Sequence, residues 1–154
     1  MSELTYFGNE IHLVVFKLGR EEYGVNILQV QEIKRMTEIT RVPHSPDYIK
    51  GVMNLRGSVL PVIDLKRRLN IPPQEHTEDT RIIIIKVEEI AVGMIVDAVS
   101  EVTIINQSDI EPPHTVVVGV TADYISGVGK LENRLLILLR SDVIIGIGQE
   151  LKVS

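Results

Sequence analysis

The stretch Ile11-His-Leu-Val-Val-Phe-Lys-Leu18 returns 69 residues later as Thr80-Arg-Ile-Ile-Ile-Ile-Lys-Val87. Lysine falls on lysine and aliphatic residues fall on aliphatic residues. Both stretches are rich in β-branched side chains, which suit a pleated strand. At the same spacing Gly24 falls on Gly93. Matches that follow one another in order indicate that the chain is a duplicated β structure.

The spacing between the copies lengthens farther along the chain. Asp47-Tyr-Ile-Lys-Gly-Val52 matches Asp123-Tyr-Ile-Ser-Gly-Val128, 76 residues later. The second copy therefore carries seven extra residues, which fall between Pro112 and Asp123.

This repeat predicts the domain organisation. Its period is longer than the roughly 20–50 residues of solenoid repeats, so two subdomains of one type are expected, at residues 10–72 and 78–140. A C-terminal helix and tail follow at residues 141–154. Several short strands in each copy would leave exposed edges, which closure into a small barrel removes. The predicted fold class is mainly β: two five-stranded barrels with short helices and a shared aliphatic interface.

Local patterns predict individual elements. The first two strands of each copy are expected at Glu10–Leu18 and Glu22–Asn26, and at Thr80–Val87 and Ile90–Val96. A later hairpin turns at Arg56-Gly57, where glycine accepts a positive φ. Asp64 is expected to cap a helix over Leu65–Leu69, and Ser141 a last helix over Asp142–Ile147.

The composition restricts the possible functions. The 154 residues carry a formal net charge of -5 and include no cysteine, which excludes disulfides and cysteine nucleophiles. An acidic chain with 4% aromatic residues lacks the basic faces and stacking rings of nucleic-acid binders, so no nucleic-acid partner is expected. The first ten residues show no signal peptide, and the apolar runs are too short to span a bilayer. We expect a cytoplasmic protein with no direct membrane insertion.

Motifs for catalysis and cofactor binding are missing from the sequence. There is no Gly-x-Ser-x-Gly elbow, and Gly127-Val-Gly129-Lys130 falls short of a phosphate loop. Gly127 is accounted for as the counterpart of Gly51. The four histidines do not stand at the spacing of metal ligands. We therefore predict no catalytic residue, no cofactor and no metal site in a protein that is not an enzyme.

The two copies differ at charged positions. Glu32 has a counterpart in Glu101, but Arg56 corresponds to Glu132, so an ion pair between Glu32 and Arg56 is expected in the first copy alone. The segment Ile27–Ile33 has apolar residues at positions 27, 28, 30 and 33. It fits an amphipathic turn packed on its own barrel, or a groove for a partner helix.

Three segments resemble the CheW-type coupling proteins of bacterial chemotaxis. Asn54-Leu-Arg-Gly-Ser-Val-Leu-Pro-Val-Ile-Asp-Leu65 is similar to the signature of that family. Glu21–Ile33 and Tyr124-Ile-Ser-Gly-Val-Gly129 resemble it too, and the similarity runs over nearly the whole chain. The resemblance implies two SH3-like barrels and a non-enzymatic adaptor that couples chemoreceptors to the chemotaxis histidine kinase, CheA.

The resemblance also implies two sets of site residues. The cytoplasmic tip of the chemoreceptor would be bound by Glu32, Arg56, Ile27, Val30, Ile33 and Val99. The regulatory domain of the kinase would be bound by Ile39, Val42 and Val59. Because the chain carries no long C-terminal extension, a free-standing adaptor is expected.

Two alternatives stay open from the sequence. A small enzyme would need a cluster of acids or histidines in a cleft between the barrels, with perturbed pKa values. A ligand- or RNA-binding barrel protein would need a basic groove with exposed aromatic side chains.

Overall fold

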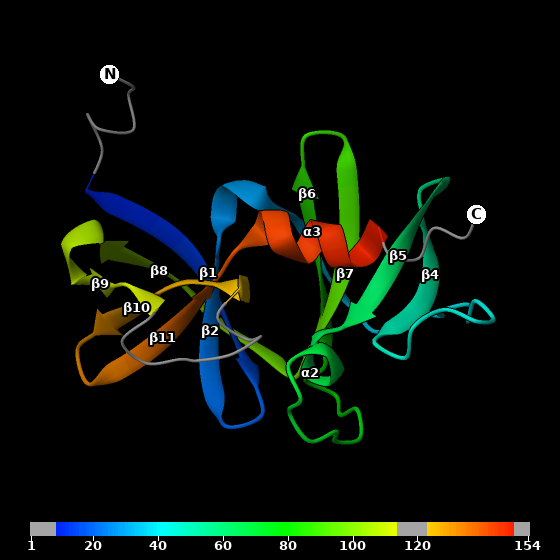
Figure 1. The fold of residues 1–154 in the computed structure, drawn as a ribbon, viewed down its shortest axis with the longest axis horizontal. Coiled ribbons are helices and arrows are strands. Elements are labelled where there is room, and N and C mark those ends of the chain that lie inside the picture. The colour runs from blue at the N-terminus through cyan, green and yellow to red at the C-terminus, as the bar shows by residue number, and fades with distance from the viewer. Residues whose placement is uncertain (1–8, 114–122, 150–154) are drawn as a thin grey trace.

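The computed structural model describes residues 9–113 and 123–149, whose strands form two sheets that lie side by side (Figure 1). In spatial order the first sheet contains β8 (Ala98–Asn106), β1 (Glu10–Leu18), β2 (Glu21–Asn26), β11 (Arg134–Leu139), β10 (Ile125–Leu131) and β9 (Ile110–Glu111). The second contains β3 (Val30–Arg35), β6 (Arg81–Val87), β7 (Ile90–Val96), β5 (Ser58–Asp64) and β4 (Ile49–Leu55). Short 3-10 turns, η1 (Ile27–Gln29) and η2 (Gln107–Asp109), and helices α2 (Leu65–Arg68) and α3 (Ser141–Gln149) complete the described elements.

The sheets do not follow the two halves of the sequence. Residues 10–72 supply β1 and β2 to the first sheet and β3, β4 and β5 to the second. Residues 78–140 supply β6 and β7 to the second sheet and β8 to β11 to the first. The prediction that each copy forms a barrel of its own is therefore wrong. The opening hairpins of the two copies are exchanged, as in domain swapping within one chain.

Parallel pairing holds each exchanged hairpin in place. β2 pairs in parallel with β11, with Gly24 opposite Leu138. β5 pairs in parallel with β7, with Val62 opposite Gly93. These contacts are the same pair of positions in the two copies, so the exchange follows a pseudo-twofold relationship.

In each sheet, the chain that leaves the strand at one edge pairs with a strand on the opposite side of the sheet. β8 continues through η2 into β9, which pairs with β10 on the far side of the sheet. In the second sheet the chain after β3 makes an isolated bridge between Thr40 and Val52 of β4. The mainly β class is confirmed. The described hydrogen bonding gives one six-stranded and one five-stranded sheet, and it does not close either into the predicted five-stranded barrel.

The bridge at Thr40 explains a repeated glycine. Gly51 has φ +151°, and a Cβ there would lie 2.1 Å from the Thr40 carbonyl oxygen. At the matching Gly127 a Cβ would lie 2.9 Å from the carbonyl oxygen of Glu111. Both positions therefore need glycine because a neighbouring backbone passes too close for a side chain. The structural reason predicted for Gly127 is confirmed.

The core joins the two sheets. One cluster of buried side chains includes Phe16 and Tyr23 of the first sheet together with Ile83 and Met94 of the second. Each sheet also has an interior cluster of its own. The shared aliphatic interface predicted from the sequence is thus present. Helix α3 lies along the second sheet and contacts β5, β6 and β7 (Figure 1).

The two predicted helix caps have opposite outcomes. The Asp64 carboxylate accepts a hydrogen bond from the Arg67 backbone N–H at 3.4 Å, so it caps α2 as expected. Ser141 lies inside α3 as its first residue, and its buried hydroxyl makes no hydrogen bond. The prediction that Ser141 caps this helix was wrong because the helix begins one residue earlier than expected.

Candidate docking surfaces

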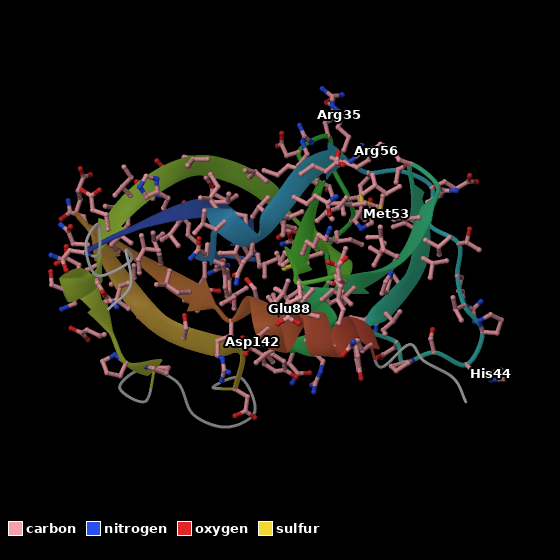
Figure 2. The ribbon with its side chains drawn as sticks, turned by 90° about the horizontal axis from the view of Figure 1, so that it is seen from above. Arg35, His44, Met53, Arg56, Glu88 and Asp142 are labelled. Atoms are coloured by element: carbon pink, nitrogen blue, oxygen red, sulfur yellow. The ribbon has the colours of Figure 1, made fainter. Side chains whose placement is uncertain are left out.

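Arg56 is presented by a tight hairpin between β4 and β5. Arg56 has φ 50° and Gly57 φ 89°, two successive positive values that are typical of a type I′ turn. The Asn54 side chain accepts a hydrogen bond from the Gly57 N–H at 2.9 Å and fixes the turn. The predicted positive φ at Gly57 is confirmed. Figure 2 shows Arg56 on the side of the second sheet away from His44.

The predicted ion pair between Glu32 and Arg56 is present. The Arg56 Nη2 contacts the Glu32 Oε2, and their side chains are 66% and 25% exposed, respectively. An exposed pair of this kind contributes about 0–1 kcal/mol to stability. Its main physical effect is to hold the guanidinium in one orientation on the surface.

The second copy has a charge network of its own. Arg134 binds Glu22 through Nε and Nη2, at 2.9 and 3.1 Å, and its Nη2 also lies 2.5 Å from Glu101. The Glu22 hydrogen bonds, followed by the one to Glu101, raise the pKa of Arg134. The expectation that the first copy alone pairs this glutamate was wrong. In the second copy the arginine stands on the other side of the hairpin turn, because Arg134 corresponds to Ser58 and not to Arg56.

The apolar residues predicted to meet a receptor lie along the boundary between the sheets. Ile27, Val30 and Val99 are half-buried and pack against the shared core, and Ile33 is 39% exposed. The segment forms a 3-10 turn followed by strand β3, in which Ile27 and Val30 pack against the core and Ile33 faces outward. Ile27, Val30 and Val99 therefore lie partly beneath the surface, and of the four residues Ile33 is the one that faces outward. The binding of a partner helix there stays a prediction.

Sequence reasoning missed two exposed aliphatic side chains on β8, Val102 at 57% and Ile104 at 47%. Leu28, which the sequence marked as apolar but did not assign to a site, is 80% exposed. Ile104 lies opposite His12 on the neighbouring strand. His12 and Leu28 both line a cleft of about 400 Å³. The alternating exposure along β8 was the available signal, because apolar residues at every second position indicate one face of a strand.

The residues predicted to meet a kinase line two different clefts. Ile39 and Val42 are half-buried and line a cleft of about 440 Å³. Val59 is 68% exposed and lies in a different cleft, of about 460 Å³, beside Arg56. Val59 therefore shares its cleft with a residue of the predicted receptor set.

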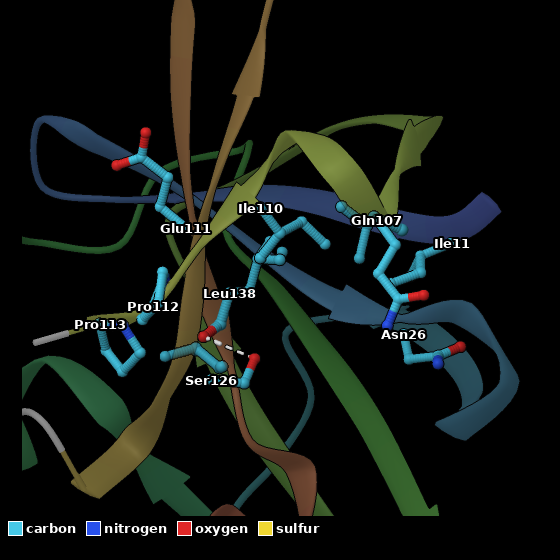
Figure 3. A pocket seen from close by; sticks show the side chains of 12 residues that line it. Ile11, Asn26, Gln107, Ile110, Glu111, Pro112, Pro113, Ser126 and Leu138 are labelled. Atoms are coloured by element: carbon cyan, nitrogen blue, oxygen red, sulfur yellow. Dashed lines mark hydrogen bonds between the residues drawn. The ribbon is translucent and has the colours of Figure 1, made fainter. Parts of the chain in front are cut away.

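A further cleft of about 480 Å³ opens on the first sheet (Figure 3). Its polar side chains include Asn26, Gln107 and Ser126, whose hydroxyl donates to the Leu138 carbonyl at 3.3 Å. Among the described lining residues the one carboxylate is that of Glu111, which pairs with Lys130 at 2.5 Å. Among residues 9–113 and 123–149, no three histidine, aspartate or glutamate side chains gather where they could hold a metal ion.

These observations define the class of protein: a duplicated two-sheet β structure that presents charged hairpins and aliphatic side chains on its surface. A family model for the CheW-like domain matches residues 12–147, so the chain belongs to the CheW-like family. The predicted family is therefore confirmed. In the part of the chain that the structure describes, no helix is long and apolar enough to cross a membrane.

Known relatives agree with this membership. The chain is 40% identical over 126 residues to Chemotaxis protein CheW of Klebsiella aerogenes, covering 82% of this chain and 76% of that protein. It is 42% identical over 133 residues to Chemotaxis protein CheW of Bacillus subtilis, covering 86% and 85%. It is similar to the crystal structure of scaffolding protein TtCheW from Thermoanaerobacter tengcongensis, with TM-score 0.79, 38% identity and 84% of each chain covered.

Proposed function

We propose that this protein is a non-catalytic adaptor of bacterial chemotaxis that couples chemoreceptors to the histidine kinase CheA in the cytoplasm. The observation that carries the proposal is the family match over residues 12–147, together with 38% identity and a TM-score of 0.79 to a solved scaffolding protein. A similarity that spans most of both chains supports the same role.

The receptor surface is formed by Glu32, Arg56, Ile27, Val30, Ile33 and Val99. The ion pair supports this assignment, because it orients a guanidinium that is 66% exposed. A charged tip, one outward aliphatic side chain, Ile33, and a half-buried aliphatic layer suit an amphipathic receptor helix, which buries an apolar stripe and pairs its charges at the rim.

The kinase surface is formed by Val59 of β5 together with Ile39 and Val42 of the connection between β3 and β4. Val59 is the strongest of the three, because a 68% exposed aliphatic side chain gains most from burial in an interface. Ile39 and Val42 are half-buried in their own cleft and act as its floor.

Coupling in such an adaptor is a difference in free energy between two bound states. The receptor state is transmitted when it changes the relative stability of the receptor and kinase contacts, and this linkage is reciprocal. No bond has to be made or broken in the adaptor, which is why we assign it no catalytic residue and no cofactor.

The test is a binding assay with a receptor tip fragment and the kinase regulatory domain. We expect the wild-type protein to bind both, and Arg56→Ala to bind the receptor fragment about tenfold more weakly, since loss of an interface arginine commonly costs about 1–2 kcal/mol or more. Arg140→Ala is the matched control, because Arg140 is an exposed arginine paired with Asp142 at 2.9 Å. The proposal would be overturned if the wild-type protein failed to bind either one of the two partners.

A further inference from the structure

Counting the described strands alone, the chain passes from one sheet to the other at two places. Between β2 and β3 it passes through the 3-10 turn η1, and between β7 and β8 it passes through the single residue Asp97. Because both crossings lie between strands of different sheets, the conformation of these two connections helps to set how the sheets are oriented.

Asp97 is tied to both sides of the molecule. Its N–H donates to the Lys17 carbonyl at 2.9 Å, and its carboxylate accepts from the Gly19 N–H at 2.8 Å, both in the first sheet's opening hairpin. The same carboxylate lies 2.9 Å from the Lys66 Nζ on α2, which directly follows β5 of the second sheet. One side chain therefore bridges the two sheets at the crossing itself.

The ion pair is largely buried. The Lys66 side chain is 10% exposed and the Asp97 side chain 27% exposed. Lys66 Nζ is buried and makes no hydrogen bond of good geometry, so its charge is compensated mainly by Asp97. A buried charge that loses its partner is strongly unfavourable, which makes this contact resistant to opening.

The other crossing has no such tie. In the repeat, Asp97 corresponds to Leu28 and Lys66 to Asp142. Leu28 is 80% exposed, and the Asn26 side chain caps η1 locally by accepting from the Leu28 N–H at 2.9 Å. Within the described residues, an ion pair therefore ties the two sheets together at the Asp97 crossing, and no corresponding ion pair is present at η1.

We propose that Asp97 and Lys66 are positioning residues that fix the orientation of the two sheets. The proposal rests on the receptor surface assigned above, which uses residues from both crossings. Ile27 and Val30 lie at η1, and Val99 lies two residues beyond Asp97. The kinase residues Ile39, Val42 and Val59 all lie between the start of β3 and the end of β5, whose strands belong to the second sheet, so their arrangement does not depend on the tie.

The test compares binding of the two partners to Asp97→Ala. We expect affinity for the receptor fragment to fall about tenfold and affinity for the kinase regulatory domain to stay within about twofold, since coupling residues commonly act at this scale. The double variant with Lys66→Met and Asp97→Ala should bind the receptor fragment no more weakly than Asp97→Ala alone, because both substitutions break the same Asp97–Lys66 contact. Asp142→Ala, at the repeat position of Lys66, should leave both affinities unchanged.

A second measurement needs no partner. The natural chain has no cysteine, so spin labels can be placed on Ser108→Cys, in η2 between strands β8 and β9 of the first sheet, and on Lys50→Cys, in β4 of the second. Both positions are exposed, and the labels report the distance between the sheets. Asp97→Ala should broaden the distance distribution, and Asp97→Asn, which keeps an acceptor for the Gly19 N–H, should broaden it less.

The outcomes separate the two proposals. Equal losses for both partners, or an unchanged distance distribution, would overturn the positioning role. If the wild-type protein did not bind the receptor fragment, the proposed function would fail, and the spin-label distances would still decide whether Asp97 orients the sheets.

Discussion

Tyr48 and Tyr124, which are repeat counterparts 76 residues apart, lie against one guanidinium, that of Arg68. The guanidinium carbon is 5.1 Å from each ring centroid. The backbone repeats the relationship: the Tyr48 carbonyl accepts from the Asp64 N–H at 2.7 Å, and the Tyr124 carbonyl from the Arg140 N–H at 2.8 Å. Arg68 therefore lies between matching positions of the two sheets.

Removing this guanidinium should destabilise the whole molecule. A cation–π contact contributes about 0.5–2 kcal/mol according to its burial, and Arg68 makes two. We expect Arg68→Met to lower the free energy of unfolding in urea by about 1–3 kcal/mol. Arg67→Met is the matched control on the same helix, because Arg67 is exposed and should change stability by less than about 0.5 kcal/mol. Equal midpoints for the two variants would contradict this account.

Arg134 should matter more for stability than Arg56. It binds Glu22 with two hydrogen bonds and also contacts Glu101, so Arg134→Gln leaves two carboxylates facing each other. With all three side chains partly exposed, we expect a loss of about 1 kcal/mol at low salt. Screening should shrink this loss in high salt.

The comparison is Arg56→Gln, whose partner Glu32 faces no second carboxylate in the described contacts. Urea unfolding at low and high salt measures both variants. A loss for Arg134→Gln that is no larger than that for Arg56→Gln, or that does not respond to salt, would refute the network.

The sequence predicted the repeat and many of the elements. The strands at Glu10–Leu18 and Ile90–Val96 and the cap at Asp64 agree with the structure. Alternating side chains reveal which residues form strands, but they do not reveal which sheet a strand joins. The exchange of the hairpins depends on the parallel pairing of β2 with β11 and of β5 with β7, which leaves no local pattern.

The candidate site was likewise predictable in part. The Glu32–Arg56 pair was predictable, because the glutamate is repeated at Glu101 and the hairpin-tip arginine is replaced by Glu132 in the second copy. The Arg134 network was not, because a comparison position by position looks for the arginine at residue 132. The side chain reaches Glu101 from the opposite end of the turn, which only the three-dimensional arrangement reveals.

Gly51 should tolerate no side chain. A Cβ at this position would lie 2.1 Å from the Thr40 carbonyl oxygen, and φ is +151°. We expect Gly51→Ala to lose about 3 kcal/mol or more, because backbone atoms have to shift and the Thr40–Val52 bridge is broken. In contrast, a Cβ added at Gly146 in α3 would meet no atom within 4 Å, and Gly146→Ala should gain up to about 1 kcal/mol. Thermal unfolding of both variants tests this contrast, and similar melting temperatures would refute it.

Tyr23 should make the protein sensitive to alkali. Burial, and then the charge of Glu21, raise the pKa of Tyr23 to about 12, whereas an unfolded tyrosine loses its proton near pH 10. Between these values the unfolded chain binds fewer protons than the folded one, so stability is intact below pH 10 and falls as the pH rises toward 12. The loss over this window amounts to roughly 2–3 kcal/mol.

Tyr23→Phe removes the ionisable group and keeps the ring that stacks on Phe16 at 6.0 Å. We therefore expect the variant to match the wild-type protein within about 0.5 kcal/mol at about pH 8 and to be the more stable of the two at about pH 11, as measured by urea unfolding. Lysines also titrate in this range, but they are common to both proteins and cancel in the difference. A difference in stability that stays the same at both pH values would mean that the Tyr23 hydroxyl ionises equally readily in the folded and unfolded chains.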